Sequence, residues 1–107
     1  NYLDDVVDKK AITSIESLKI GKEMSIVGIV RSVKTIVVKN GKDKGRPMAF
    51  ITLYDESDEI DCTFFSSLYA AYQTKIKFND ILLLKGIKEI RDNRASFIVR
   101  SCQILRS

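Results

Sequence analysis

The sequence contains no histidine and only two cysteines, Cys62 and Cys102, which are far apart in the chain. Without a Cys-x-x-Cys pair or a histidine, the common zinc sites and thioredoxin-like redox centres cannot form. Serine and cysteine nucleophiles also lack the histidine that usually activates them, and no phosphate-cradling GxxxxGK[ST] pattern is present. We therefore predict no catalytic residue, no bound metal and no cofactor. Both cysteines lie in apolar runs, which predicts buried thiols.

Long hydrophobic runs are also missing. No run reaches the roughly 18 apolar residues of a membrane span, and no charged start leads into a signal segment, so we expect no membrane association and a cytoplasmic location. The 107 residues, 45% of them hydrophobic and 30% charged, are typical of one soluble domain. The chain begins with Asn1 instead of methionine, which favours a segment of a longer polypeptide.

Positive charge is concentrated in one short region. Residues 31–46 carry six cations and one anion, whereas residues 47–107 carry eight of each sign. Such a local excess is typical of a surface that binds a polyanion, although a solvated loop would show the same composition. The six cations are Arg31, Lys34, Lys39, Lys42, Lys44 and Arg46.

Five segments rich in apolar and β-branched residues predict five strands, at residues 24–38, 48–54, 60–65, 81–90 and 95–104. Gly28 lies where the long first strand could bend sharply. After the third strand, Leu68, Tyr72 and Ile76 recur at four-residue intervals, which predicts a helix of about three turns. The predicted order is three strands, one helix and two strands.

This order is the plan of the oligonucleotide/oligosaccharide-binding (OB) fold, an all-β five-stranded barrel with one helix between strands 3 and 4. An SH3-like barrel would not place a full helix there. We expect the barrel domain to occupy residues 23–107 and residues 1–22 to form a lead-in. Within the lead-in, Ile15 and Leu18 should pack a short helical turn against the barrel before Gly21 ends it.

In the OB fold, ligands lie across strands 2 and 3, between the loop joining strands 1 and 2 and the loop joining strands 4 and 5. Alternation along the second strand would leave Phe50 on the outside, where a ring offers a stacking surface of about 1–3 kcal/mol per base. The alternative is that Phe50 packs beneath the neighbouring loop or against another domain, and Phe65 could point either way. The inward positions are expected to be Ala49, Ile51, Leu53, Ile60, Cys62 and Phe64.

The predicted nucleic-acid-binding residues combine the basic region with this outer face and with the second basic loop. The glycines at positions 41 and 45 would let the first loop move towards a phosphate backbone. The acidic stretch DESDEID at residues 55–61 lacks the glycine and terminal glutamate of a calcium loop, so we expect a solvated turn there. The predicted binding residues are Arg31, Lys34, Lys39, Lys42, Lys44, Arg46, Met48, Phe50, Thr63, Arg91 and Arg94.

The segment VGIVRSVKTIVVKNGKDKGRPMAFITLYDESDEIDCTFFSSLYAAY resembles the OB-fold domain of the bacterial DNA polymerase III alpha subunit. The likeness extends over roughly residues 24–104, and Ser66 stands where that family often has proline. The resemblance implies a non-catalytic module of a DNA-directed DNA polymerase that binds the single-stranded template and helps to keep the enzyme on DNA. The matching positions are Met48, Ala49, Phe50, Thr52, Leu53, Asp55, Phe65 and Tyr69.

The partners expected from this resemblance are single-stranded DNA, bound with little sequence preference, the remainder of the polymerase chain and other replisome subunits. Two alternatives remain open from the residues. Anticodon-binding domains of class II aminoacyl-tRNA synthetases place a similar phenylalanine on strand 2, and a barrel of this kind could instead be a protein-docking module. Binding that weakens with salt distinguishes the nucleic-acid functions from protein docking.

Overall fold

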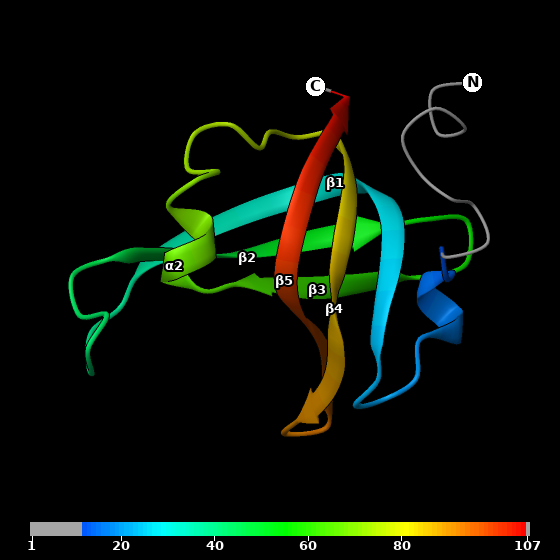
Figure 1. Ribbon diagram of the computed structural model, residues 1–107, viewed down its shortest axis with the longest axis horizontal. Helices are drawn as coiled ribbons and strands as arrows, with labels where there is room; N and C mark the ends of the chain where they lie inside the picture. The colour runs from blue at the N-terminus through cyan, green and yellow to red at the C-terminus, as the bar shows by residue number, and fades with distance from the viewer. Residues whose placement is uncertain (1–11, 107) are drawn as a thin grey trace.

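The computed structural model describes residues 12–106, which form a closed five-stranded barrel with the strand order β1-β2-β3-β5-β4 (Figure 1). The predicted OB-fold arrangement is confirmed, and each strand begins and ends within two residues of its predicted bounds. The first part of the predicted lead-in, residues 1–11, lies outside the described residues. The strands are β1 (Glu23–Val37), β2 (Pro47–Tyr54), β3 (Glu59–Phe64), β4 (Ile81–Arg91) and β5 (Arg94–Arg106).

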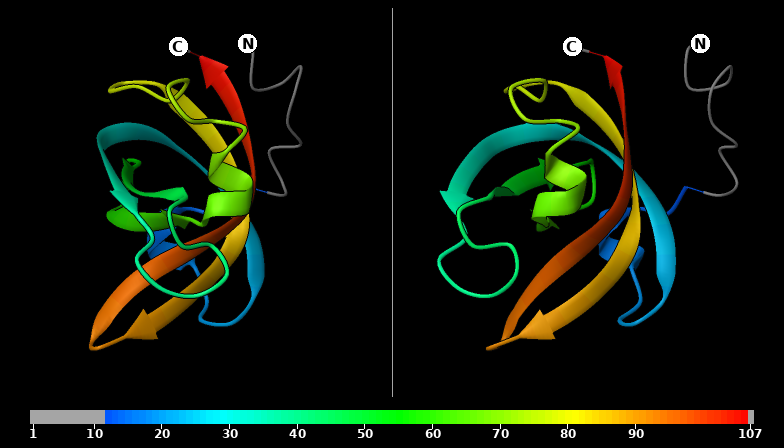
Figure 2. Two further views of the ribbon diagram at one scale, coloured as in Figure 1. Left: turned by 90° about the vertical axis from the view of Figure 1, so that its left-hand side faces the viewer. Right: turned by 60° about the vertical axis from the view of Figure 1, so that its left-hand side comes forward.

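The barrel closes because β1 pairs with two neighbours in succession. Its first half runs antiparallel to β4 through Ile29, and its second half runs antiparallel to β2 from the same residue onward. Gly28 lies just before this change of partner, and a Cβ atom there would lie 2.7 Å from both Leu53 Cγ and the Tyr54 carbonyl oxygen. Only glycine therefore lets β1 bend this closely over β2. The two rotated views show the strong curvature of β1 around the barrel (Figure 2).

The barrel interior contains the side chains that alternation assigned to it. Ala49, Ile51 and Leu53 of β2 are fully buried. Leu82 and Leu84 of β4 meet them from the other side of the closed sheet. The predicted inward residues of β3, Ile60, Cys62 and Phe64, are also buried, so both sets of inward positions are confirmed.

The predicted helix of about three turns is wrong. The α-helix α2 has four residues, Ser66–Tyr69, and hydrogen-bonded turns continue the chain to residue 75. Several of these turns use i to i−3 bonds, such as Ala71 N–H to the Leu68 carbonyl, and Thr74 has a φ of 71° that a right-handed helix cannot contain. Within residues 12–106, no helix is long and apolar enough to cross a membrane.

Tertiary contacts explain why the four-residue spacing did not produce a longer helix. The Phe64 ring meets the rings of Tyr69 and Tyr72 edge to face, with centroids 6.4 and 6.5 Å apart. The Tyr72 hydroxyl donates a hydrogen bond to the Cys102 carbonyl oxygen of β5, and the Tyr69 and Thr35 hydroxyls are 2.9 Å apart. The contacts of Tyr69 and Tyr72 with the barrel therefore determine the path of residues 66–75, and that path is not a continuous helix.

A short 3-10 helix, η2 (Ile15–Ser17), packs against the turn between β2 and β3, as predicted for Ile15 and Leu18 (Figure 1). Both side chains are buried, and Gly21 follows with a φ of 79°. The backbone N–H of Ile15 donates a 2.8 Å hydrogen bond to Asp55 Oδ2. The 3-10 helix η2 is thereby fastened to the β2–β3 turn.

Asp55 therefore has a structural role that the expectation of a solvated turn missed. Its Oδ1 accepts hydrogen bonds from the Ser57 hydroxyl at 2.6 Å, the Ser57 N–H at 2.7 Å and the Asp58 N–H at 3.1 Å. Burial alone would raise the pKa of Asp55, but the bonds from Ser57, Ile15 and Asp58 outweigh it and lower the pKa below its ordinary value.

We predict that Ser66→Pro stabilises the domain by about 1 kcal/mol. Ser66 is the first residue of α2, where the N–H has no intrahelical partner and proline is favoured. The preceding Phe65 is extended, at φ −66° and ψ 160°, as a residue before proline must be. The buried Ser66 hydroxyl has no hydrogen-bond partner within the described residues, so its removal is also favourable. Urea unfolding would measure the change.

Ser66→Ala is the matched control for this variant, because it removes the hydroxyl without restricting the backbone. A proline variant less stable than the alanine variant would show that the ring does not fit at this helix start.

We predict that Asp55→Asn destabilises the domain by about 1–2 kcal/mol at neutral pH, because an amide nitrogen cannot accept the Ile15 hydrogen bond. A lowered pKa in the folded state means that the contribution of Asp55 is present above its ordinary value of 3.8 and is lost as the pH falls below it. The difference in unfolding free energy between the parent and the variant should therefore shrink on acidification. Denaturant unfolding across acidic pH would measure it.

The control for this prediction is Glu56→Gln, which removes one negative charge from the same turn at an exposed position. An equal loss of stability in both variants would assign the effect to turn charge instead of to the hydrogen bonds of Asp55.

Candidate nucleic-acid interface

A groove of about 620 Å³ crosses the outer face of β1, β2 and β3 and ends at the β4–β5 hairpin. Outward side chains of β1, β2, β3 and the start of β5 form its floor, and the β4–β5 hairpin forms one wall. We call it the outer groove. Its lining residues are Ser32, Lys34, Met48, Phe50, Thr52, Asp61, Thr63, Phe65, Arg91, Asp92, Arg94, Ala95, Ser96 and Ile98.

The floor of the outer groove consists of two cross-strand rows set by strand register. The first row crosses the sheet from Lys34 through Phe50 and Thr63 to Ile98. The second row lies two residues earlier on β1, β3 and β5 and two residues later on the antiparallel β2. It consists of Ser32, Thr52, Asp61 and Ser96. Because directly paired side chains lie about 5 Å apart, each row is a continuous surface.

Two aromatic rings line the outer groove. Phe50 is half-buried at the centre of the first row, on the outer face that alternation predicted. Phe65 is 45% exposed and lies between the end of β3 and the start of α2, as the N-cap residue of that helix. If alternation continued past β3, Phe65 would face the same side as Thr63. Because Phe65 follows the last residue of the strand, the sequence alone did not predict which side its ring faces.

The β4–β5 hairpin carries two of the predicted cations into the outer groove. Arg91 and Arg94 face each other across a two-residue turn whose central residues, Asp92 and Asn93, have φ angles of 53° and 63°. Positive φ at both central positions is the type I′ geometry that suits the twist of a hairpin. Within residues 12–106 neither arginine forms an ion pair. Both guanidinium groups are therefore available to an anionic ligand.

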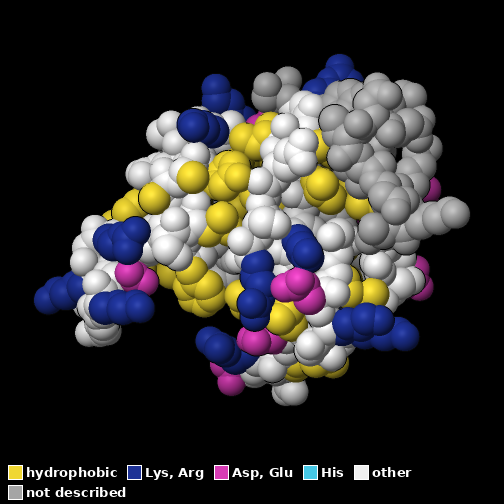
Figure 3. All heavy atoms as spheres, viewed as in Figure 1, with side chains coloured by type: hydrophobic (Ala, Val, Ile, Leu, Met, Phe, Trp, Pro, Cys, Tyr) yellow, Lys and Arg dark blue, Asp and Glu magenta, His cyan; other side chains and the backbone are white. Residues whose placement is uncertain are grey.

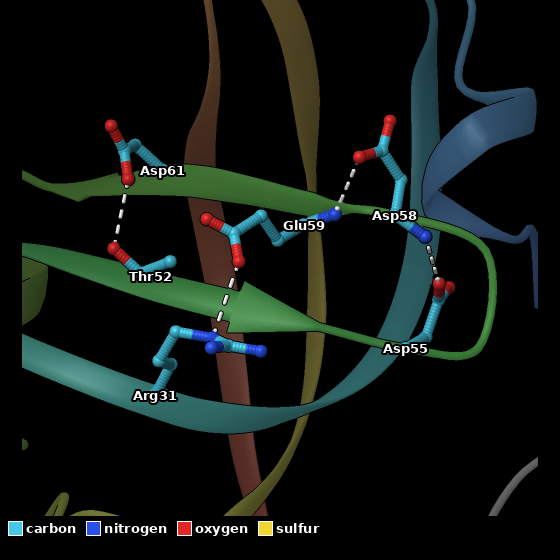
Figure 4. Close-up of polar contacts among 6 residues, drawn as sticks. All are labelled: Arg31, Thr52, Asp55, Asp58, Glu59 and Asp61. Atoms are coloured by element: carbon cyan, nitrogen blue, oxygen red, sulfur yellow. Dashed lines mark hydrogen bonds and ion pairs between the residues drawn. The ribbon is translucent and has the colours of Figure 1, made fainter.

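The second row contains a carboxylate beside a hydroxyl. The Thr52 hydroxyl donates a 2.8 Å hydrogen bond to Asp61 Oδ1, and the two side chains lie on the same outer face of β2 and β3 (Figure 4). The outer groove is thus lined by three cations, Lys34, Arg91 and Arg94, and by two anions, Asp61 and Asp92. Its electrostatic character is mixed and not uniformly basic.

Six of the predicted binding residues line the outer groove, and five do not. Arg31 lies on the same outer face but is ion-paired to Glu59 at 3.2 Å (Figure 4). Its guanidinium carbon also lies 4.6 Å from the centre of the Tyr54 ring. The other four are on the β1–β2 loop. The six that line the groove are Lys34, Met48, Phe50, Thr63, Arg91 and Arg94, and the four on the loop are Lys39, Lys42, Lys44 and Arg46.

The β1–β2 loop projects from the barrel, and its cations gather around an acidic side chain at the left edge of Figure 3. Arg46 forms a 2.9 Å ion pair with Asp43 inside the loop. Backbone bonds from Gly45 N–H to the Val38 carbonyl and from Val38 N–H to the Arg46 carbonyl close the loop base. Gly41 and Gly45 have φ angles of 86° and 85°, so both supply turn geometry that other residues rarely adopt.

Neither cysteine is chemically activated. Cys62 is fully buried, as predicted, and burial raises the pKa of its thiol. Cys102 is only half-buried, and burial raises its pKa to about 12. Both side chains are therefore protonated thiols at neutral pH. Within residues 12–106, no three His, Cys, Asp or Glu side chains are grouped to hold a metal ion.

Residues 24–105 match the protein family described as an OB-fold nucleic acid binding domain. The chain belongs to this family. It is 28% identical over 102 residues to the DNA polymerase III subunit alpha of Streptococcus pyogenes, and 30% identical over 73 residues to that of Staphylococcus aureus. These alignments cover 95% and 68% of this chain, and confirm the resemblance drawn from its motifs. The chain spans 10% and 6% of the length of these two relatives.

A domain of replication protein A from Methanococcus maripaludis has a similar structure, with a TM-score of 0.73. The match covers 90% of this chain and 97% of that one at 16% identity. At this identity the similarity shows that both are OB folds. The fold of the domain thus agrees with its family assignment.

We predict that Phe50→Ala changes the stability of the OB-fold domain by about 1 kcal/mol or less, because the ring lies on the outer face. Phe64→Ala, on the same sheet, should cost about 3–5 kcal/mol, because that ring is fully buried against two tyrosines. Thermal or urea unfolding of both variants tests the comparison. Similar losses would place the Phe50 ring in the core.

Proposed function

We propose that this OB-fold domain binds single-stranded DNA in the outer groove, as a non-catalytic module of a bacterial DNA polymerase III alpha chain. One observation carries the proposal: two aromatic rings, Phe50 and Phe65, line a single groove with cations from separate elements of the barrel. Aromatic platforms combined with positive charge along a groove are the usual means of binding single strands without a strict sequence requirement.

In the proposed complex, the strand crosses β2 and β3 with its bases on the two rings. Each stacked base contributes about 1–3 kcal/mol, whichever base it is. Phosphates lie towards Lys34 on one side and towards Arg91 and Arg94 on the hairpin side. Met48 and Thr63 complete the floor beside Phe50, but they are buried, at 9% and 6% exposure, so they support the Phe50 ring more than they contact the strand.

The β1–β2 loop is proposed as a secondary contact outside the outer groove. Lys39, Lys42 and Lys44 are exposed and attract the part of a longer strand that extends past Phe65. Arg46 and Arg31 contribute less, because each is already paired with an acidic neighbour. The charge excess in residues 31–46 then raises the rate of association with the strand, and it contributes less to the affinity of the bound complex.

The proposed role in a longer polymerase chain is supported by the relatives that this chain matches. A domain that binds weakly and with little sequence preference would hold the single-stranded template near a catalytic centre located elsewhere in the same cytoplasmic enzyme. The remainder of that chain and other replisome subunits are the expected protein partners.

We predict that Arg91→Ala combined with Arg94→Ala weakens binding of a labelled oligothymidylate about 10- to 30-fold at 0.1 M salt. Each phosphate contact on a single strand contributes a slope of about −0.7 in log affinity against log salt, which is roughly fivefold per contact at this concentration. The parent domain, with about three contacts, should show a slope of roughly −2. Fluorescence anisotropy at several salt concentrations measures both quantities.

The matched control is Lys42→Ala combined with Lys44→Ala, which removes the same charge from the other basic loop. This variant should lose only about two- to threefold in affinity. A salt-independent affinity would contradict the proposal and favour protein docking. Tighter binding of the same sequence as RNA would favour the alternative of anticodon-like recognition.

A further inference from the structure

The second row of the outer groove is unusual for a surface proposed to bind a polyanion. Its four residues, Ser32, Thr52, Asp61 and Ser96, are all polar, and one carries a negative charge. A carboxylate repels phosphate, so the DNA backbone cannot lie over this row. What can lie over it is the edge of a base, provided that the edge presents hydrogen-bond donors.

The hydrogen bond already present makes the Thr52–Asp61 pair of this row an acceptor. The Thr52 hydroxyl uses its single proton on Asp61 Oδ1, so its remaining capacity is to accept. Within residues 12–106, the second carboxylate oxygen of Asp61 has no hydrogen-bond partner. The Thr52 bond also restrains the carboxylate on the groove side of β3 (Figure 4). The pair is therefore a positioned acceptor without a donor of its own.

The stacking ring and this acceptor are diagonal neighbours on adjacent strands. Phe50 pairs with Thr63, and Asp61 is two residues before Thr63 on β3. Diagonal positions of this kind have Cα atoms about 7–8 Å apart, which long and aromatic side chains can span. A base stacked on Phe50 and extending along the sheet would bring its Watson–Crick edge over Asp61. The cations of the hairpin lie at the groove wall, where they can hold the phosphates of the same nucleotide.

We propose that Asp61 makes the outer groove select guanine at the position stacked on Phe50. This inference rests on the proposed binding of single-stranded DNA. Guanine has two adjacent donors on its Watson–Crick edge, N1–H and the N2 amino group, which match the two oxygens of a carboxylate. Such bidentate, charge-assisted pairs are stronger and more selective than single neutral hydrogen bonds.

The other bases match this acceptor less well. Cytosine and adenine each offer one amino group next to a ring acceptor, which faces a lone pair of the carboxylate. Thymine offers one imino donor between two carbonyl oxygens, and both carbonyls repel the carboxylate. The expected order therefore has guanine first and thymine last. The difference between them should be about five- to tenfold, at the low end for bidentate base contacts because Asp61 is exposed.

The test compares pentanucleotides that differ only in the central base. Oligothymidylate, the same strand with a central guanine and the same strand with central hypoxanthine are titrated into the domain. Hypoxanthine keeps N1–H but lacks the N2 amino group, so it should lose most of the guanine advantage. Asp61→Asn keeps the size of the side chain and an acceptor for Thr52, but it removes the second acceptor and the charge.

In Asp61→Asn, the strand with the central guanine should lose its bidentate partner, and oligothymidylate should bind somewhat more tightly because a repulsive charge is gone. The five- to tenfold preference for guanine should therefore fall below about twofold. Glu59→Gln is the matched control. It removes one negative charge from the same face of β3, at a side chain that pairs with Arg31 outside the groove. That variant should keep the full guanine preference.

The outcomes separate this inference from the proposed function. Salt-dependent binding of all three strands with equal affinity would overturn the guanine preference and leave the proposed binding intact. A preference that persists in Asp61→Asn would also overturn it, because another group would then read the base. No measurable binding of any of these strands, with the same result for longer oligothymidylates, would overturn both.

Discussion

The structure depends on one backbone constraint, the change of partner of β1 at Gly28 and Ile29. The strand can pair with β4 and then β2 only because no side chain stands between its backbone and Leu53 and Tyr54. This bend closes the sheet, and closure leaves one inside and one outside for all five strands. A glycine that takes no part in the outer groove therefore permits the closed sheet whose outer face carries it.

Strand register orders the side chains of that outer face. Residues from β1, β2, β3 and β5, distant in the chain, become neighbours in two rows because strand pairs align them. The first row centres on Phe50 and suits base stacking, and the second centres on the Thr52–Asp61 pair and suits a base edge. Two different kinds of recognition can thus lie a few ångströms apart on one face. Besides these two rows, the outer groove is formed by the β4–β5 hairpin with its two arginines and by Phe65.

Charge and contact are distributed differently in this domain. Residues 31–46 hold the excess of positive charge, with six cations against one anion, yet most of these cations lie on a loop outside the outer groove. The two hairpin arginines come from a part of the chain whose charges sum to zero. In the proposed complex, the β1–β2 loop therefore attracts the nucleic acid at long range, and the β4–β5 hairpin contacts it directly. A region chosen by charge count alone would point to the first and miss the second.

The sequence alone determined the strands, their inward faces, the barrel and the family, because alternation and glycine placement are local signals that burial enforces. It also indicated Phe50, whose parity follows from three inward neighbours on the same strand. It did not determine the length of α2, the role of Asp55 or the side on which Phe65 lies. These depend on partners far along the chain: Cys102 for Tyr72, Ile15 for Asp55, and the hairpin wall that forms one groove with Phe65. Only the tertiary structure could decide these features, because they are stabilised by contacts with residues distant in the chain. Such contacts cannot be read from the local sequence pattern.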